Sequence, residues 1–88
     1  MEFRKLERRV KGFANHRRIE IIELLKRRSE LSVADIAETL KINFKTASEH
    51  IRRLAQSGMV LKRNDGRMVR HKLTPRAEKV LTFLRMLE

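Results

Sequence analysis

Two groups of side chains in this 88-residue sequence have types and spacing that could do chemistry. The first lies along a helix predicted for 44–57 and consists of Lys45, Thr46, Ser48, Glu49, His50, Arg52 and Arg53. The second lies in a β-hairpin predicted for 59–73 and consists of Lys62, Arg63, Arg67 and Arg70. Ammonium, guanidinium and hydroxyl groups donate hydrogen bonds to phosphates and base edges, so these groups indicate nucleic-acid binding.

The sequence lacks the arrangements that are typical of an enzyme. It has no nucleophile beside a base, no paired carboxylates in an apolar setting and no phosphate-binding glycine loop. It has no cysteine, which excludes disulfides and thiolate metal sites. His16, His50 and His71 lie far apart and show no ligand spacing. We therefore expect no catalytic residues, no metal and no cofactor.

Positive charge is concentrated in the same part of the chain. The formal net charge is +11. Residues 41–72 hold nine basic and two acidic residues, a net charge of +7, against +3 for residues 1–40 and +1 for residues 73–88. A polyanion is the natural partner of such a patch. The alternative is a solvated charged surface that keeps a small domain soluble.

Apolar periodicity predicts a single domain over residues 1–88 that is mainly α with a small β-hairpin. Helices are predicted over 2–14, 16–28, 32–40 and 44–57, strands over 59–63 and 67–73, and a last helix from Thr74-Pro75. Ser32 and Asp35 have the spacing of a capping box, and Asn43 has the position of an N-cap. Gly58 is expected to stop the fourth helix, and Asn64-Asp65-Gly66 to make the hairpin turn.

The fourth helix has two kinds of surface. An inward stripe of small and branched residues is predicted from Ala47, Ser48, Ile51, Leu54 and Ala55, although the angle of Ser48 suits either side. Two outward stripes are predicted, one from Lys45, Glu49, Arg52 and Gln56 and the other from Thr46, His50, Arg53 and Ser57. A helix of this width fits the major groove, with its N-terminal residues nearest the base edges.

Positions on these stripes suggest roles. Lys45 and Thr46, in the first turn, are candidates for base edges, and Arg52 and Arg53 for phosphates. Glu49 could accept from cytosine N4 or could hold the two arginines. His50 is expected to contact the DNA backbone or the hairpin, where its protonation would make binding weakly pH-dependent. The cationic hairpin tip is expected on the backbone or in a minor groove.

The first helix places basic side chains around Phe3, Leu6, Val10 and Phe13, and Gly12 is expected to weaken its end. The last helix has a wide apolar arc. Ala77, Val80, Leu81, Leu84 and Leu87 make one face, and Phe83 and Met86 widen it. This arc could be a partner surface, and the alternative is ordinary core packing.

Several segments resemble ArsR-type winged-helix transcriptional regulators. They are FANHRRIEII at 13–22, LSVADIA at 31–37, TASEHIRRL at 46–54, Gly58-Met59-Val60, Asp65-Gly66-Arg67 and the strand 69–73. The ending Leu73-Thr74-Pro75 also resembles MarR-type regulators. The resemblance implies a winged helix-turn-helix fold in the order α-α-α-α-β-β-α. It also implies a homodimer formed by the N- and C-terminal helices, with each recognition helix in one half-site of a near-palindrome.

The resemblance implies a sequence-specific regulator of transcription that binds double-stranded DNA as a dimeric repressor. Because no apolar run approaches the length of a membrane span and no signal peptide is visible, we expect a cytoplasmic protein. The alternatives are a non-specific nucleoid-associated or RNA-binding winged-helix protein, and a protein-interaction module for an acidic partner. Metal sensing through a cysteine pair, which many relatives use, is impossible here, and residues 75–88 contain no histidine for the other common metal site. His71 stands where the family usually has an aromatic ring, so we expect a packed ring and not a ligand.

Overall fold

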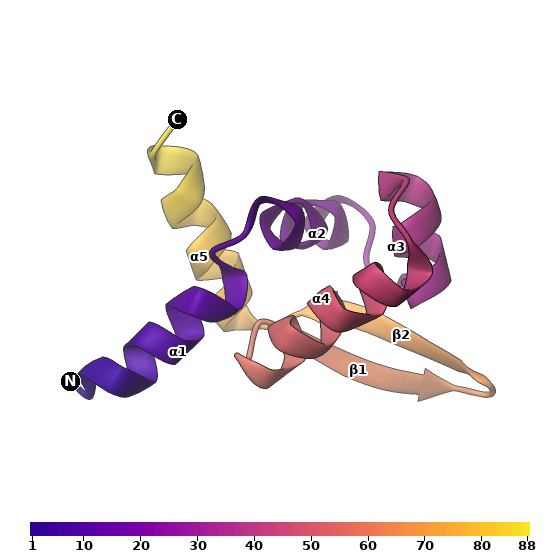
Figure 1. Cartoon of the computed structure of the whole chain (residues 1–88), viewed down its shortest axis with the longest axis horizontal. Helices are drawn as coiled ribbons and strands as arrows, with labels where there is room; N and C mark the ends of the chain where they lie inside the picture. The colour runs from indigo at the N-terminus through magenta and orange to yellow at the C-terminus, as the bar shows by residue number, and fades with distance from the viewer.

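The computed structural model describes all 88 residues and has five helices and one β-hairpin. The helices are α1 (Phe3–Phe13), α2 (His16–Arg27), α3 (Val33–Leu40), α4 (Phe44–Gln56) and α5 (Pro75–Met86), and the strands are β1 (Val60–Asp65) and β2 (Met68–Leu73). The predicted order α-α-α-α-β-β-α is confirmed. Figure 1 shows α2 above α4, the hairpin reaching out below α3, and α1 and α5 at the opposite end. None of the helices combines the length and the apolar character needed to cross a bilayer.

Side-chain caps fix where four of the helices begin, and Asn15 is the cap of α2. The Asp35 N–H donates to the Ser32 hydroxyl at 3.1 Å and the Ser32 N–H donates to the Asp35 carboxylate at 3.0 Å, which completes the predicted capping box. Asn43 caps α4, and Thr74 caps α5 with Pro75 in the first helical position. Because these side chains satisfy N–H groups that have no partner within the helix, the starts of α3, α4 and α5 lie where local sequence predicts.

The hydrophobic core gathers around α2. This helix contributes four buried side chains, those of Ile21, Ile22, Leu24 and Leu25. Around them pack Leu31, Ile36, Ile51, Leu54, Met59, Val60, Ala77 and Leu81 from the other elements. Burying each Leu or Ile side chain stabilises the fold by roughly 1.5–3 kcal/mol. The core thus joins α2–α5 and the base of the hairpin, whereas α1 contributes no buried residue.

The hairpin, hereafter the wing, has a shorter loop than the sequence predicted. Its strands pair antiparallel with Asp65 opposite Met68 next to the loop. The loop therefore consists only of Gly66 and Arg67, and the predicted three-residue turn over 64–66 is wrong. Gly66 has a φ of +63°, which a residue without a Cβ adopts readily and which a tight two-residue hairpin loop requires at its first position.

Helices α3 and α4 form a helix-turn-helix. Lys41 ends α3 in the left-handed conformation with a φ of +55°. Gly58 follows α4 with a φ of +78°, as predicted for the residue that stops this helix. Three residues of the predicted inward stripe of α4, Ala47, Ile51 and Leu54, are buried. The helix is thereby held with its opposite side toward solvent.

Two serines of the predicted fourth helix are placed by the structure. Ser48, whose angle suited either side, is exposed, whereas Ser57, predicted on an outward stripe and inside the helix, is buried at the C-cap, so that prediction is wrong. The Ser57 hydroxyl donates to the Leu54 carbonyl at 3.1 Å. Ser57 is covered because α1 crosses α4 here: a Cβ added to Gly12 would clash with the Ser57 Cβ. Gly12 therefore does not end α1 but lets it approach α4 closely.

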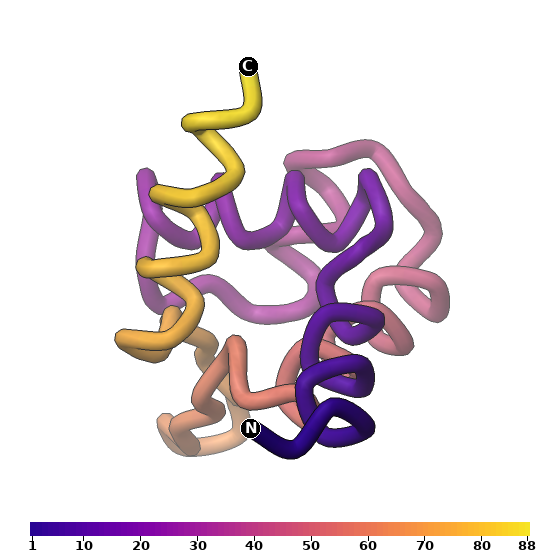
Figure 2. Tube along the Cα trace, turned by 90° about the vertical axis from the view of Figure 1, so that its left-hand side faces the viewer, coloured from indigo at the N-terminus to yellow at the C-terminus, as the bar shows by residue number.

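Helices α1 and α5 leave apolar side chains in solvent. Figure 2 shows both helices facing the viewer at one end of the molecule. Phe3 on α1 is 77% exposed, and Met86 on α5 is 75% exposed. Leu87 was predicted on the main apolar face, but α5 ends at Met86 and Leu87 is 66% exposed. Val10 and Phe83 are also exposed, so the single chain leaves an apolar surface uncovered at this end.

Candidate nucleic-acid interface

The first turn of α4 presents free polar side chains to solvent. The Asn43 side-chain oxygen accepts from the N–H groups of Lys45 and Thr46 at 2.8 and 3.3 Å, which holds the turn in place. The side chains of Lys45, Thr46 and Ser48 are exposed and form no ion pair or hydrogen bond within the chain. When a helix enters the major groove, its first turn lies nearest the base edges. The structure thus exposes Ser48 together with Lys45 and Thr46, the two residues predicted for the base edges.

Phe44 is a member of this surface that the sequence analysis missed. It is the first residue of α4, and its ring is 59% exposed beside Lys45. Ala47, three residues later, is the first buried residue of the helix. An exposed apolar ring here can contact a thymine methyl group. The sequence signal was an aromatic residue directly after an N-cap.

Glu49 holds two arginines on the outer side of α4. Its carboxylate accepts from Arg52 Nε at 2.9 Å and from Arg53 Nε at 3.3 Å. These hydrogen bonds, mainly the one from Arg52, lower the pKa of Glu49 to about 2, and the same pair raises the pKa of Arg52. Of the two roles considered for Glu49, holding the arginines is the one whose contacts are present. The three side chains together carry one positive charge.

His50 is half-buried and lies against α2. Its Nδ1 lies 3.4 Å from a guanidinium nitrogen of Arg18. Burial and then the charge of Arg18 lower the pKa of His50. Its imidazole is therefore neutral at pH 7, where it packs beside Arg18 and adds no charge to the outer surface.

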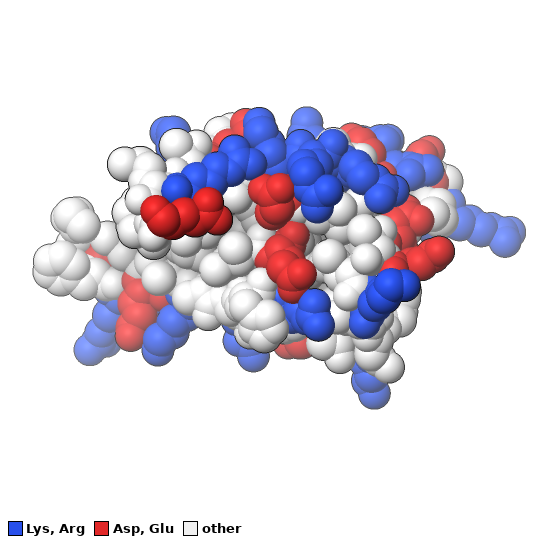
Figure 3. Space-filling model, turned by 90° about the horizontal axis from the view of Figure 1, so that it is seen from above, with Lys and Arg blue, Asp and Glu red and all other residues white.

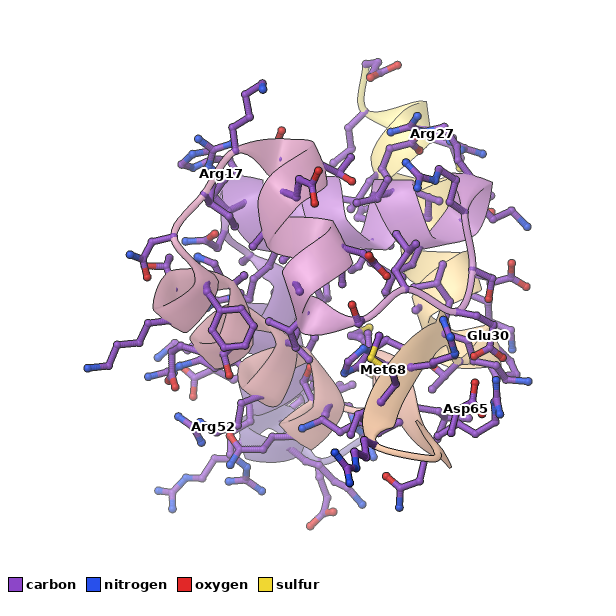
Figure 4. The ribbon with its side chains drawn as sticks, turned by 90° about the vertical axis from the view of Figure 1, so that its right-hand side faces the viewer. Arg17, Arg27, Glu30, Arg52, Asp65 and Met68 are labelled. Carbon is purple, nitrogen blue, oxygen red and sulfur yellow. The ribbon has the colours of Figure 1, made fainter.

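Two of the four predicted basic residues of the wing are engaged by acidic groups. Arg63 pairs with Glu30 at 3.3 Å, and Arg70 pairs with Asp65 at 2.7 Å. Arg70 also donates to the Glu30 carbonyl at 3.1 Å. Figure 4 shows Glu30 and Asp65 on the wing side of the molecule and Arg52 beyond α4 on the other side. These two arginines brace the wing against the segment that precedes α3.

The other two of the four predicted residues, Lys62 and Arg67, are exposed and have no ion pair. Arg67 lies in the two-residue loop at the tip. Both are free to bind a phosphate. The wing therefore has fewer free cations than its composition indicated.

His71 is buried at the base of the wing. Only 1% of it is exposed, and its ring Nδ1 donates to the Leu31 carbonyl at 2.8 Å. A carbonyl only accepts, so the hydrogen of the neutral ring lies on Nδ1. Burial lowers the pKa of His71. The predicted packed ring is confirmed, and the structure contains no cluster of three or more His, Asp and Glu side chains that could hold a metal ion.

On the face over α2 and α5, basic side chains pair with acidic ones. Figure 3 shows acidic groups set among basic ones on this face. Arg27 and Arg85 both pair with Glu23 at 3.0 Å, and Lys26 pairs with Glu78 at 2.6 Å. Each of these cations contacts a carboxylate, although Glu23 serves two of them. The cations at the first turn of α4 and at the wing tip have no such partner, which makes those two places better sites for an external anion.

The helix-turn-helix and the start of the wing match a family model. The model, described as bacterial regulatory protein of the arsR family, covers residues 15–62, which is 48 of the 88 residues. The chain belongs to the ArsR family. The resemblance noted in the sequence is thereby confirmed, and the family is one of transcription regulators.

Solved structures similar to this ArsR-family chain are winged helix-turn-helix proteins. HlyU from Vibrio cholerae is 28% identical with a TM-score of 0.83, and the match covers 99% of this chain and 97% of HlyU. Mb0332 from Mycobacterium bovis, a homodimeric winged helix-turn-helix DNA-binding domain, is 26% identical with a TM-score of 0.87 over 97% of this chain and 79% of its own. The repressor PagR of Bacillus anthracis is 23% identical with a TM-score of 0.80 over 94% and 99% of the chains, a likeness of fold. The predicted winged helix-turn-helix fold is confirmed.

Proposed function

We propose that this ArsR-family regulator binds double-stranded DNA sequence-specifically, with α4 in the major groove and the wing on the backbone or in the minor groove. The observation that carries the proposal is the first turn of α4, where Lys45, Thr46 and Ser48 are exposed and unpaired. The wing packs beside α4, as Figure 4 also shows, so both elements can meet one duplex.

The side chains of α4 divide into two roles in this proposal. Lys45 and Thr46 contact base edges, and Ser48 joins them as a hydroxyl donor. Arg52 and Arg53 contact phosphates while Glu49 keeps their guanidinium groups aligned on the helix. His50 acts indirectly by supporting Arg18.

The wing contributes binding without sequence preference. Lys62 and Arg67 contact the backbone, or Arg67 at the tip enters a minor groove. Arg63 and Arg70 stay with Glu30 and Asp65 and keep the wing at a fixed angle to α4.

The regulator acts as a homodimer formed through α1 and α5. Exposed apolar side chains on both helices support this, as does an open hollow of about 670 Å³ lined by residues of α2 and α5, including Ile19, Leu81 and Leu84. Covering these groups removes apolar surface from water. A dimer places two α4 helices on one face of DNA, and a dimer that occupies a promoter represses it.

Selection of bound duplexes from a random pool tests the proposal. The expected result is a near-palindrome whose half-sites are separated by about one helical turn, or roughly 10 base pairs. A salt titration with the selected duplex, a random duplex and a structured RNA then compares the functions. Equal affinity for all three would replace specific regulation by general nucleic-acid binding. Failure to bind any of them at low salt would favour an acidic protein partner.

A further inference from the structure

A cleft of about 320 Å³ lies where α1 passes the C-terminal end of α4, and none of the side chains that line it is apolar. Its lining residues are Arg8, Arg9, Lys11, Gly12, Arg53, Gln56 and Ser57. Four of these seven residues are cationic. Of these lining residues, only Arg53 is also a proposed DNA contact of α4. DNA binding by α4 therefore does not explain why the other cations lie together here.

Carboxylates do not neutralise this α1–α4 cleft. Lys11 pairs with Glu7 at 3.3 Å, but both side chains are more than half exposed. Arg53 shares the carboxylate of Glu49 with Arg52. Arg8 and Arg9 form no ion pair with any acidic group of the chain. Cations gathered without partners repel one another, and an anion between them would relieve the repulsion.

A fifth cation adds to this excess from α2. Arg18 donates to the Lys11 carbonyl at 3.3 Å. Its Nε is buried and has no hydrogen-bond partner. Burial and then the charge of Arg53 lower the pKa of Arg18, so the two guanidinium groups already act on each other. The junction of α1, α2 and α4 therefore holds more positive charge than the chain can compensate.

We propose that the α1–α4 cleft binds a phosphate group. Arginine guanidinium groups form bidentate, charge-assisted hydrogen bonds with phosphate oxygens, and the Gln56 amide and a lysine supply further donors. A lining without apolar groups suits a small, highly charged ligand better than a hydrophobic effector. The phosphate belongs either to the DNA backbone, which rests on the proposed DNA binding, or to a free phosphorylated molecule.

The cleft stays accessible in the proposed dimer. Val10 is exposed on α1, and its neighbours Arg8 and Gly12, each two residues away along the helix, point to the opposite side. A partner chain that covers the apolar side of α1 therefore leaves the cationic side open. Arg53 lines the cleft and is also a proposed DNA contact, so a free phosphorylated ligand there competes with DNA for this arginine.

Two double variants with equal charge loss test the site. Arg8→Gln/Arg9→Gln removes two cations from the cleft, whereas Arg4→Gln/Lys5→Gln removes two from the same helix outside it. The wild-type protein and both variants are titrated with inorganic pyrophosphate in the absence of DNA, and binding is followed by the NMR shifts of the Gly12 and Ser57 amides. Separately, affinity for the selected duplex is measured as a function of salt.

With pyrophosphate, we expect saturable shifts in the wild type and the control variant and at least about tenfold weaker binding in the cleft variant. With DNA, we expect the cleft variant to lose more affinity than the control and its salt slope to fall by about 0.9 for each lost phosphate contact. If the cleft variant differs from the control only with pyrophosphate, the cleft binds a free phosphorylated ligand. If it differs only with DNA, the cleft binds a backbone phosphate. If it differs with both, the two compete for the cleft.

Equal behaviour of the two double variants in both assays overturns the site, because charge alone then explains the result. Absence of pyrophosphate binding together with unchanged DNA binding overturns it as well. The pyrophosphate assay contains no DNA. A failure of the proposed function, seen as no duplex selected from the pool, is therefore distinguished from a failure of the cleft.

Discussion

The N–H of Glu30 donates to the carbonyl oxygen of His71 at 2.9 Å. In return the His71 N–H donates to the Leu31 carbonyl at 3.0 Å, and the His71 ring donates to the same carbonyl at 2.8 Å. Three hydrogen bonds thus tie the wing to the two residues before the α3 cap. The wing and the helix-turn-helix are therefore connected at a buried point, and the angle between them depends on the His71 ring.

Stability should fall as the pH drops below about 6.5. Burial lowers the pKa values of His71 and His50 from 6.5, so the folded chain binds fewer protons than the unfolded chain below that pH. The stability that these two neutral histidines contribute is complete above pH 6.5 and is lost as the pH falls toward their pKa values in the folded chain. Thermal unfolding between about pH 7.5 and 5 should show a decreasing Tm. His71→Phe keeps a ring and should weaken this dependence; an unchanged pH profile in the variant would contradict the assignment.

Glu49→Gln should strengthen binding to all DNA. The substitution removes a negative charge from the outer side of α4 and releases Arg52 and Arg53 to phosphates. We expect a roughly threefold to tenfold gain at low salt, without a new sequence preference. Binding is measured on the selected duplex and on each single-base variant of it. Loss of discrimination at one cytosine would show instead that the carboxylate contacts a base.

Lys45→Ala and Arg67→Ala should have different signatures. Lys45 in the first turn of α4 contacts a base edge in our proposal, so its loss should change the selected sequence and cost roughly 1–3 kcal/mol on the preferred duplex. Arg67 contacts a phosphate, so its loss should weaken binding to all sequences and reduce the salt slope by about 0.9. Selection and salt titration of both variants check this. Uniform loss with Lys45→Ala would remove that residue from the base contacts.

Gly12→Ala should destabilise the fold by roughly 1–3 kcal/mol, because the added methyl group overlaps the Ser57 Cβ. In the background of Ser57→Gly the clash disappears. The same substitution should then stabilise by up to about 1 kcal/mol, since alanine is the better helix former. Urea unfolding of the two single variants and the double variant gives this comparison. A stabilising Gly12→Ala in the wild-type background would show that α1 does not pack on α4 as described.

Phe83→Glu should convert the proposed dimer into a monomer. Phe83 is 54% exposed on α5, and Leu61 on the wing is 52% exposed, which makes Leu61→Glu a matched control. The charge on α5 would be buried without a partner in the dimer interface, whereas the charge on the wing remains in solvent. Sedimentation at several protein concentrations distinguishes them. Dissociation by both variants, or by neither, would place the interface elsewhere.

Local sequence chemistry was enough to predict much of the fold. The Ser32–Asp35 capping box, the Asn43 cap and the Thr74-Pro75 start each involve residues within three positions of one another. Gly58 likewise ends α4 through its own backbone conformation. Apolar periodicity gave the buried side of α4 for the same reason, because helix geometry relates neighbouring turns directly.

The candidate site was harder to predict where it depends on distant residues. Arg63 and Glu30 are 33 positions apart, and nothing in either neighbourhood shows that they pair. The burial of Ser57 follows from how α1 crosses α4 at Gly12. That crossing is a contact between helices that are separated by two other elements. Composition therefore overstated the free charge of the wing and missed the cationic cleft.

The absence of a buried residue in α1 has a consequence for how the protein responds to its own abundance. An isolated helix of 11 residues is marginal in water, and this one packs on the chain mainly near Gly12 and Phe13. If the first turns of α1 become ordered only against a second chain, mass action makes both helicity and stability rise with concentration. Below the dimer dissociation constant, occupancy of a DNA site then grows with the square of the chain concentration. The number of molecules in the cell would itself act as a signal, to which occupancy responds more steeply than it would for a monomer.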